Sequence, residues 1–205
     1  MNKAVALTCA ALALQVSAVG WLVLRYERIV RNGTEFRLKC RAYDPYDPLR
    51  GRYLAMTVSE ECTNILFKVK EEHIWQGMDE KAFAKLVKMP GGGLYRVDAI
   101  AREPMDDGLW VKPASLWIRD ALGYSDKRKD ESDDEFKARR DKAGFKAVMS
   151  FPDQFFVNEK IAPEAEKLLR EKSDSAVAVY RAYDGRIVLT DIEIDGKPIL
   201  SAVKE

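Results

Sequence analysis

The chain has 205 residues, of which 33% are charged and 47% hydrophobic, which is enough for one folded domain with a sizeable core. It carries 34 Lys and Arg against 33 Asp and Glu, so no net field favours nucleic acid as a partner. The 3 cysteines form no Cys-x-x-Cys and there is 1 histidine. This argues against a zinc site, and no residue set indicates another metal or a cofactor.

Residues 4–24 are 21 residues without a charge. As an α-helix, at about 1.5 Å per residue, this run spans roughly 30 Å, the hydrocarbon thickness of a bilayer. Trp21 and Tyr26 stand where interfacial aromatic residues belong, and three arginines follow between residues 25 and 31. We therefore predict a transmembrane signal anchor at 1–28, which contacts the lipid bilayer through residues 4–24, followed by one domain at 33–205.

A cleaved signal peptide is the alternative, because Lys3 gives a basic start and Val16-Ser17-Ala18 resembles a cleavage site. The apolar run continues past Ala18 to Leu24, which favours an anchor that is kept. The positive-inside rule places the domain in the cytoplasm, whereas the short segment before the run resembles the start of a signal anchor. Charge alone leaves the orientation open.

Two stretches after the anchor alternate apolar and polar residues. Between Phe36 and Ala42 every second side chain is apolar, and the pattern recurs from Leu54 to Val58. Both predict half-buried strands. The prolines between them fix φ near −65° and keep the preceding aspartates out of helical space, so we predict a rigid corner. A small ion site at Asp44, Asp47 and Arg50 is the alternative, although it lacks the ligands that calcium needs.

The later elements follow from turn and helix signals. Residues 78–88 place Phe83, Leu86 and Val87 on one helical face, and the PGGG at 90–93 would end this helix. Strands are predicted at 94–101 and 109–118, with a turn at Asp106-Asp107-Gly108 between them.

Residues 126–142 hold 14 charges among 17 residues, 7 of each sign, which predicts a solvated helix or excursion with Phe136 against the core. Pro163 opens a helix at 163–172. Asp184-Gly185 and Asp195-Gly196 mark turns between β-rich runs. The predicted fold class is α+β, mostly β: an N-terminal transmembrane helix, then one β-rich domain of antiparallel strands with two or three short helices.

Together these features resemble the GDYXXLXY family, which has an N-terminal anchor, a strand, a DPrDplRGdY corner and a later YFVpEG…E segment. The corner here consists of Asp44, Pro45, Asp47, Pro48, Leu49, Arg50, Gly51 and Tyr53, and the second segment contains Phe156, Val157, Glu159 and Glu166. The resemblance covers most of residues 4–200, with 124–144 as a charged insertion.

The naming motif, Gly-Asp-Tyr-x-x-Leu-x-Tyr, is altered at three positions, by Arg52, Met56 and Val58. Arg52 removes the one carboxylate of the motif, whereas Met56 keeps an apolar position. The resemblance implies an extracytoplasmic domain held at the bacterial inner membrane, facing the periplasm or exterior. It further implies a gene neighbour that encodes a multi-pass membrane protein, and it implies no activity.

We therefore expect a non-enzymatic domain that binds or supports another envelope membrane protein. One alternative is a membrane-anchored hydrolase of Ser–Lys or carboxylate type, with Ser59, Ser150, Glu159 and Glu166 as its candidates. Another is a cleaved, exported binding protein. His73 has no placed partner for acid–base work, and whether Cys40 and Cys62 pair is left open.

Overall fold

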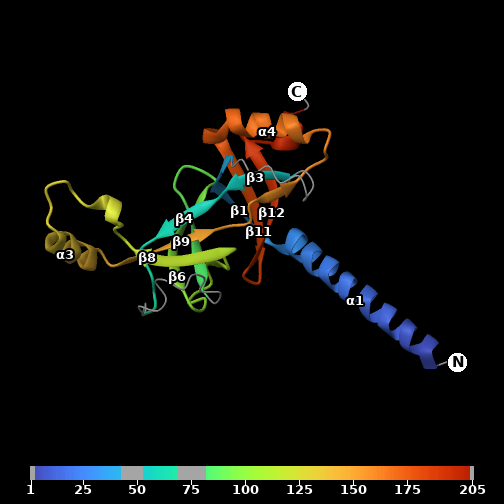
Figure 1. The fold of residues 1–205 in the computed structure, drawn as a ribbon. Helices are drawn as coiled ribbons and strands as arrows, with labels where there is room; N and C mark the ends of the chain where they lie inside the picture. The colour runs from blue at the N-terminus through green and yellow to red at the C-terminus, as the bar shows by residue number, and fades with distance from the viewer. Residues whose placement is uncertain (1–2, 43–52, 69–81, 204–205) are drawn as a thin grey trace.

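The computed structural model describes residues 3–42, 53–68 and 82–203. Its elements in chain order are α1 (Lys3–Asn32), β1 (Thr34–Lys39), β2 (Arg41–Ala42), β3 (Tyr53–Thr57), β4 (Ser59–Cys62), β5 (Phe83–Lys88), β6 (Tyr95–Ala101), β7 (Leu109–Val111), β8 (Ser115–Asp120), η1 (Tyr124–Asp126), α3 (Asp133–Ala143), β9 (Phe145–Ser150), β10 (Gln154–Phe156), α4 (Ala162–Glu171), η2 (Ser173–Ser175), β11 (Ala176–Tyr183), β12 (Arg186–Ile194), β13 (Lys197–Pro198) and α5 (Ile199–Ala202). The strands form antiparallel sheets in the orders β1-β11-β12-β13, β10-β3-β2, β4-β9-β8 and β6-β5-β7. This confirms the predicted fold class (Figure 1).

Long strands pass from one sheet to the next. β1 runs on into β2, and β3 runs on into β4. The segment that carries β9 and then β10 runs antiparallel to them, so that β10 pairs with β3 and β9 pairs with β4. At the bend, the Phe151 N–H donates to the Val58 carbonyl (3.0 Å) and the Met56 N–H to the Asp153 carbonyl (3.1 Å). Because these segments cross from one sheet to another, the inner faces of the sheets share the main core.

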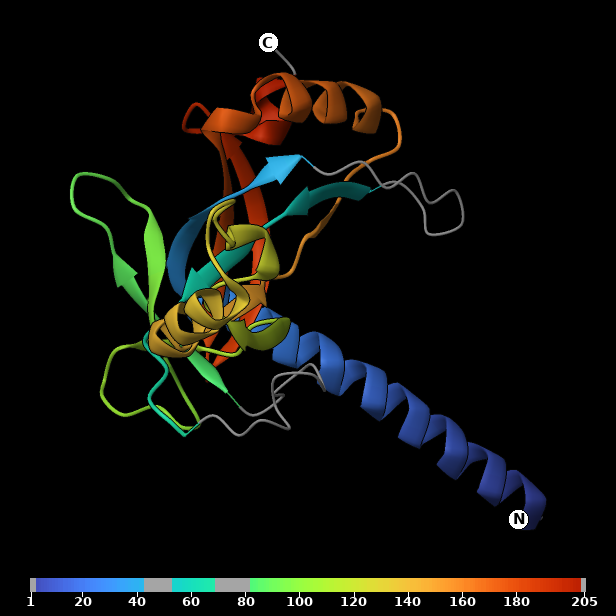
Figure 2. The ribbon, with the colours of Figure 1, turned by 60° about the vertical axis from the view of Figure 1, so that its left-hand side comes forward.

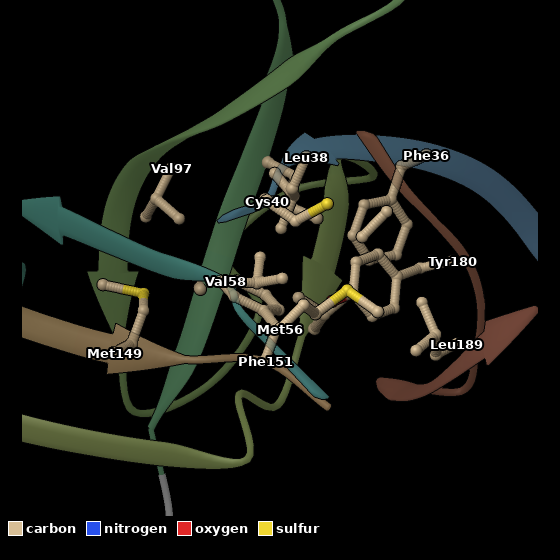
Figure 3. Close-up of a cluster of buried hydrophobic side chains, with 14 of the residues drawn as sticks. Phe36, Leu38, Cys40, Met56, Val58, Val97, Met149, Phe151, Tyr180 and Leu189 are labelled. Carbon is tan, nitrogen blue, oxygen red and sulfur yellow. The ribbon is translucent and has the colours of Figure 1, made fainter. Parts of the chain in front are cut away.

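The core is centred on aromatic side chains from three segments (Figure 3). Phe36 of β1 stacks on Tyr180 of β11 with ring centroids 5.2 Å apart, and Phe151 lies 6.1 Å from the same ring. The Tyr180 hydroxyl donates a hydrogen bond to the Pro152 carbonyl (2.8 Å). Since a buried hydroxyl must be paired, this bond fixes the bend after β9 over the four-stranded sheet.

The apolar helix α1 leaves the sheets as a straight rod (Figures 1 and 2). In the described chain it is the one helix long and apolar enough to span a membrane, as residues 4–24 predict, and residues 7–19 are exposed throughout. It extends further than expected, to Asn32, where it contacts β11 and β12 and buries Ile29.

The joint between α1 and β1 is close-packed. Arg181 donates to the Val30 carbonyl (2.9 Å), which satisfies one of the free carbonyls at the end of the helix. Gly33 follows, and a Cβ added there would lie 2.4 Å from the Ile29 carbonyl oxygen. The helix therefore enters the sheet without a linker.

The prediction of a helix at 78–88 is wrong over its described part. Residues 83–88 form β5, in which Ala84 and Leu86 point into the core while Lys85 does not. The inward positions include Ala82 and Ala84, and alanine is a strong helix former. Its small side chain hides the period-two pattern, and the PGGG forms the turn between β5 and β6.

Three other predictions can be compared with the structure. The expected strand at 109–118 is two strands, because Pro113 interrupts it and has no N–H for a ladder. Asp184 and Asp195 have φ of 51° and 53°, each followed by a glycine with positive φ, as the two predicted turns require. Helix α4 confirms the helix predicted at 163–172.

The charged segment leaves the sheet between β8 and β9 and carries α3 (Figure 1). Ser132 and Glu135 form a capping box at its start, and Arg139 bonds to Glu131 (2.8 Å). Phe136 is 5% exposed but is not a member of the core cluster that the described residues form. Phe136 is therefore buried, as expected, and its ring centroid lies 5.5 Å from the guanidinium of Arg139 in the same segment.

Replacing Tyr180 with Phe should lower the free energy of unfolding by about 1–3 kcal/mol, because the Pro152 carbonyl loses its partner. Tyr183→Phe is the matched control, since Tyr183 is 40% exposed, and it should cost less than about 0.5 kcal/mol. Urea denaturation of the purified protein in mild detergent measures both. Equal stability of the two variants would contradict the role given to the Tyr180 hydroxyl.

Replacing Gly33 with Ala should destabilise the joint by about 1–3 kcal/mol, because the added methyl group meets backbone rather than a movable side chain. Gly92→Ala is the control, since a Cβ at Gly92 would meet only the Leu94 nitrogen at 3.9 Å. Limited proteolysis after Arg31 should become faster in the Gly33 variant alone. Unchanged cleavage in both variants would show that the joint tolerates a side chain.

Candidate functional site

The two segments of the family resemblance lie side by side. β10 pairs with β3 antiparallel, with Phe156 opposite Tyr53 and Phe155 opposite Leu54. The rings of Tyr53 and Phe156 are 6.0 Å apart at an interplanar angle of 52°, within the range of favourable aromatic pairs. Residues far apart in the sequence thus form one feature, which we call the aromatic patch (Tyr53 and Phe156).

Strand alternation places this patch on the outside. Leu54 is fully buried and Phe155 packs against the core, while Tyr53 is half-buried and Phe156 is 69% exposed. An isolated exposed aromatic residue is ordinary, but two paired rings on neighbouring strands form a continuous apolar surface. Aromatic residues of this kind are enriched where proteins bind one another.

The turn after β10 is held by Asn158. Its side-chain oxygen accepts from the Lys160 N–H (3.0 Å), and its carbonyl accepts from the Ile161 and Ala162 N–H groups (3.0 Å each). Val157 packs against the core just before this turn. An Asn side chain that bonds two residues ahead pre-forms a turn, so α4 begins at a fixed point beside the patch.

Helix α4 lies against β2 and β3 and buries Ala162, Ala165 and Leu169. Glu166 is half-buried on its second turn, and Glu159 is exposed in the preceding turn. No described residue forms a hydrogen bond or ion pair with either carboxylate. The structure therefore gives Glu159 and Glu166 no shared proton or polar partner within its described part.

The proline corner itself lies outside the described residues: Asp44, Pro45, Asp47, Pro48, Leu49, Arg50 and Gly51 belong to 43–52. His73 also lies outside, in 69–81. Tyr53 is described, as are residues 54–58 of the naming motif, whereas Arg52 also lies in 43–52, outside the described residues. Met56 and Val58 are fully buried, so the substituted side chains still fill apolar core positions.

The serines proposed for a hydrolase lie on β4 and β9. Ser59 is opposite Ser150, and the Ser150 hydroxyl is 2.6 Å from that of Ser115 on the other side. Lys146 donates a hydrogen bond to Glu61 (2.9 Å). This bond contributes most to lowering the pKa of the Glu61 carboxyl. Lys146 and Ser150 are on one strand, about 13 Å apart, which is too far for proton transfer.

The described cysteines are free thiols, and Cys40 and Cys62 are buried in the core. Burial raises the pKa of Cys40 to about 12 and raises that of Cys62 as well. A nucleophilic thiol needs a lowered pKa, so both are structural. Among the described residues, no three of His, Cys, Asp or Glu are grouped to hold a metal ion.

A model of the GDYXXLXY protein family matches residues 15–192. The chain belongs to the GDYXXLXY family. The matched range begins inside α1 and ends within β12, so it includes the aromatic patch and the charged segment around α3. Neither the comparison with curated proteins nor the comparison with solved structures found a match.

In this GDYXXLXY protein the sequence singles out Tyr53 and Phe156 but does not indicate that their rings lie against each other. The missing element was β10, which is only three residues long. The signal was present, because Phe155 and Val157 pack inward on either side of the outward Phe156. Period two over three residues is too short to identify a strand, and its partner is about a hundred residues away.

In the native protein, Cys40 and Cys62 should resist a water-soluble maleimide at pH 7, because burial and a raised pKa leave almost no accessible thiolate. A Cys9→Ser background removes the third thiol. Mass spectrometry should find two labels only after denaturation. Rapid labelling of the folded protein would contradict the burial of these thiols.

Proposed function

We propose that this GDYXXLXY protein is a single-pass protein of the bacterial inner membrane, whose domain faces the periplasm or exterior. There it binds or supports another envelope membrane protein and catalyses no reaction of its own. The observation that carries this proposal is the exposed aromatic patch on a domain that is joined to an apolar helix without a linker.

The short distance between the apolar helix and the domain favours a partner that lies within the membrane or at its surface. The charge-free run ends at Leu24 and the helix at Asn32, so the domain begins about 12 Å from the hydrocarbon boundary, at about 1.5 Å per residue. The polar layer of a bilayer is roughly 5–8 Å thick on each side. A domain held at this height reaches proteins that project little from the lipid surface.

The orientation rests on the family resemblance rather than on charge. Arg25, Arg28 and Arg31 follow the run and Lys3 precedes it, which by the positive-inside rule alone would favour a cytoplasmic domain. The short segment before the run and the family resemblance favour the opposite direction. Protease added to intact spheroplasts should therefore digest the domain.

The aromatic patch supplies the kind of side chains that anchor an interface. A few central aromatic residues carry most of the binding free energy in many complexes. Phe156 is suited to this role because 69% of it is exposed in the isolated chain, so a partner can remove it from water. Tyr53 beside it adds a hydroxyl that can bond at the rim.

Replacing Phe156 with Ala should weaken co-purification of the partner at least tenfold, while protein stability stays nearly unchanged. A tenfold loss corresponds to about 1.4 kcal/mol, which is ordinary for a central aromatic residue. Trp117→Ala is the matched control, because Trp117 is 52% exposed on a different sheet. Detergent-solubilised membranes and quantitative mass spectrometry provide the measurement.

Three results would count against the proposal. They are a wild-type protein that purifies alone with measurable turnover, full retention of the partner by the Phe156 variant, or equal loss in the Trp117 control. The cleaved alternative is tested on the same sample by mass: a mature chain that starts at Val19 would mean that the helix is removed.

A further inference from the structure

One polar amide lies near the middle of the apolar helix. Gln15 is one residue beyond the centre of the charge-free run 4–24, and it is exposed on α1. Of the residues that the structure describes, none bonds to its side chain. α1 stands apart from the domain here (Figures 1 and 2), and Gln15 lies about 25 Å from Asn32 along the helix axis.

A bilayer gives this side chain no partner of its own. Helix backbone groups are satisfied within the helix, but the Gln side chain has two N–H donors and a carbonyl oxygen that need partners. Gln15 is too short to reach the polar layer from the centre of the hydrocarbon, as a lysine near a helix end can. A neighbouring transmembrane helix can supply the missing hydrogen bonds.

The helix face around Gln15 allows such a neighbour to come close. At 3.6 residues per turn, Ala11 and Ala18 lie above and below Gln15 on one face, whereas Ala13 lies on the opposite face. The two alanines flank the amide with the smallest side chains that keep the helix intact. Two backbones can therefore approach until side-chain amides meet across the contact.

We infer that α1 pairs with the α1 of a second copy of this chain, through hydrogen bonds between the two Gln15 amides. The second copy enters the membrane in the same direction, so its Gln15 lies at the same depth. An amide both donates and accepts, so in a two-fold contact each Gln15 donates one N–H to the carbonyl oxygen of the other and accepts one in return. This inference rests on the proposed function only in requiring that the helix is kept.

Cysteine cross-linking of the full chain in native membranes tests the pairing. In a Cys9→Ala background, Ala11→Cys and Ala18→Cys should give disulfide-linked dimers on mild oxidation, and Ala13→Cys should not. Cys40 and Cys62 are buried and remain in all variants. The three substitutions are chemically identical, so a difference between them reports the face of the helix.

Replacing Gln15 with Leu in the Ala18→Cys protein should lower the dimer association constant about five- to thirtyfold, or about 1–2 kcal/mol. Gln15→Asn keeps an amide and should retain most of the dimer. Equal cross-linking at Ala13, no effect of Gln15→Leu, or an intact chain that stays monomeric would each overturn the inference. So would cross-links at Ala18 to a different membrane protein alone.

The N-terminal mass of the same samples separates this result from failure of the proposed function. A chain that lacks residues 1–18 would remove the anchor and with it both proposals. An intact, membrane-bound monomer that still co-purifies with its partner through Phe156 would overturn the pairing and leave the proposed function standing.

Discussion

The two segments 53–62 and 145–156 run antiparallel and change sheets together, held by backbone hydrogen bonds on both sides of Val58. At this bend the chain leaves one ladder before it joins the next, so its polar groups need other partners. The Tyr180 hydroxyl meets that need at the Pro152 carbonyl. The aromatic patch lies just beyond one end of the bend and the charged segment beyond the other, so both depend on this crossing.

Much of the fold can be predicted from sequence patterns that extend over only a few residues. The alternation from Phe36 to Cys40 correctly predicts an inward face, and the aspartate–glycine turns adopt the positive φ angles that such pairs favour. Local signals failed where small residues carried the pattern, as Ala84 does in β5. They also failed at β9, which the sequence did not predict and whose inward positions are only Ala147 and Met149.

The candidate site, too, was predictable from the sequence only in part. The family resemblance supplied its residues, since Tyr53 and Phe156 lie in the two segments that it singles out. Their contact depends on the register between β3 and β10, which is set by long-range packing rather than by either segment alone. Strand spacing, which the sequence does fix, keeps Lys146 away from Ser150, and Glu61 on the neighbouring strand bonds to that lysine.

The close-packed joint at Gly33 makes the helix and the sheet that it joins move as one rigid body. A transmembrane helix that is longer than the local lipid is thick tilts to keep its apolar residues covered. With Ile29 buried and Arg181 bonded to Val30, there is no hinge to absorb that tilt. In a bilayer, a change in thickness would therefore tilt the whole domain and raise or lower Phe156 relative to the headgroups, so that lipid composition would control the position of the proposed binding surface.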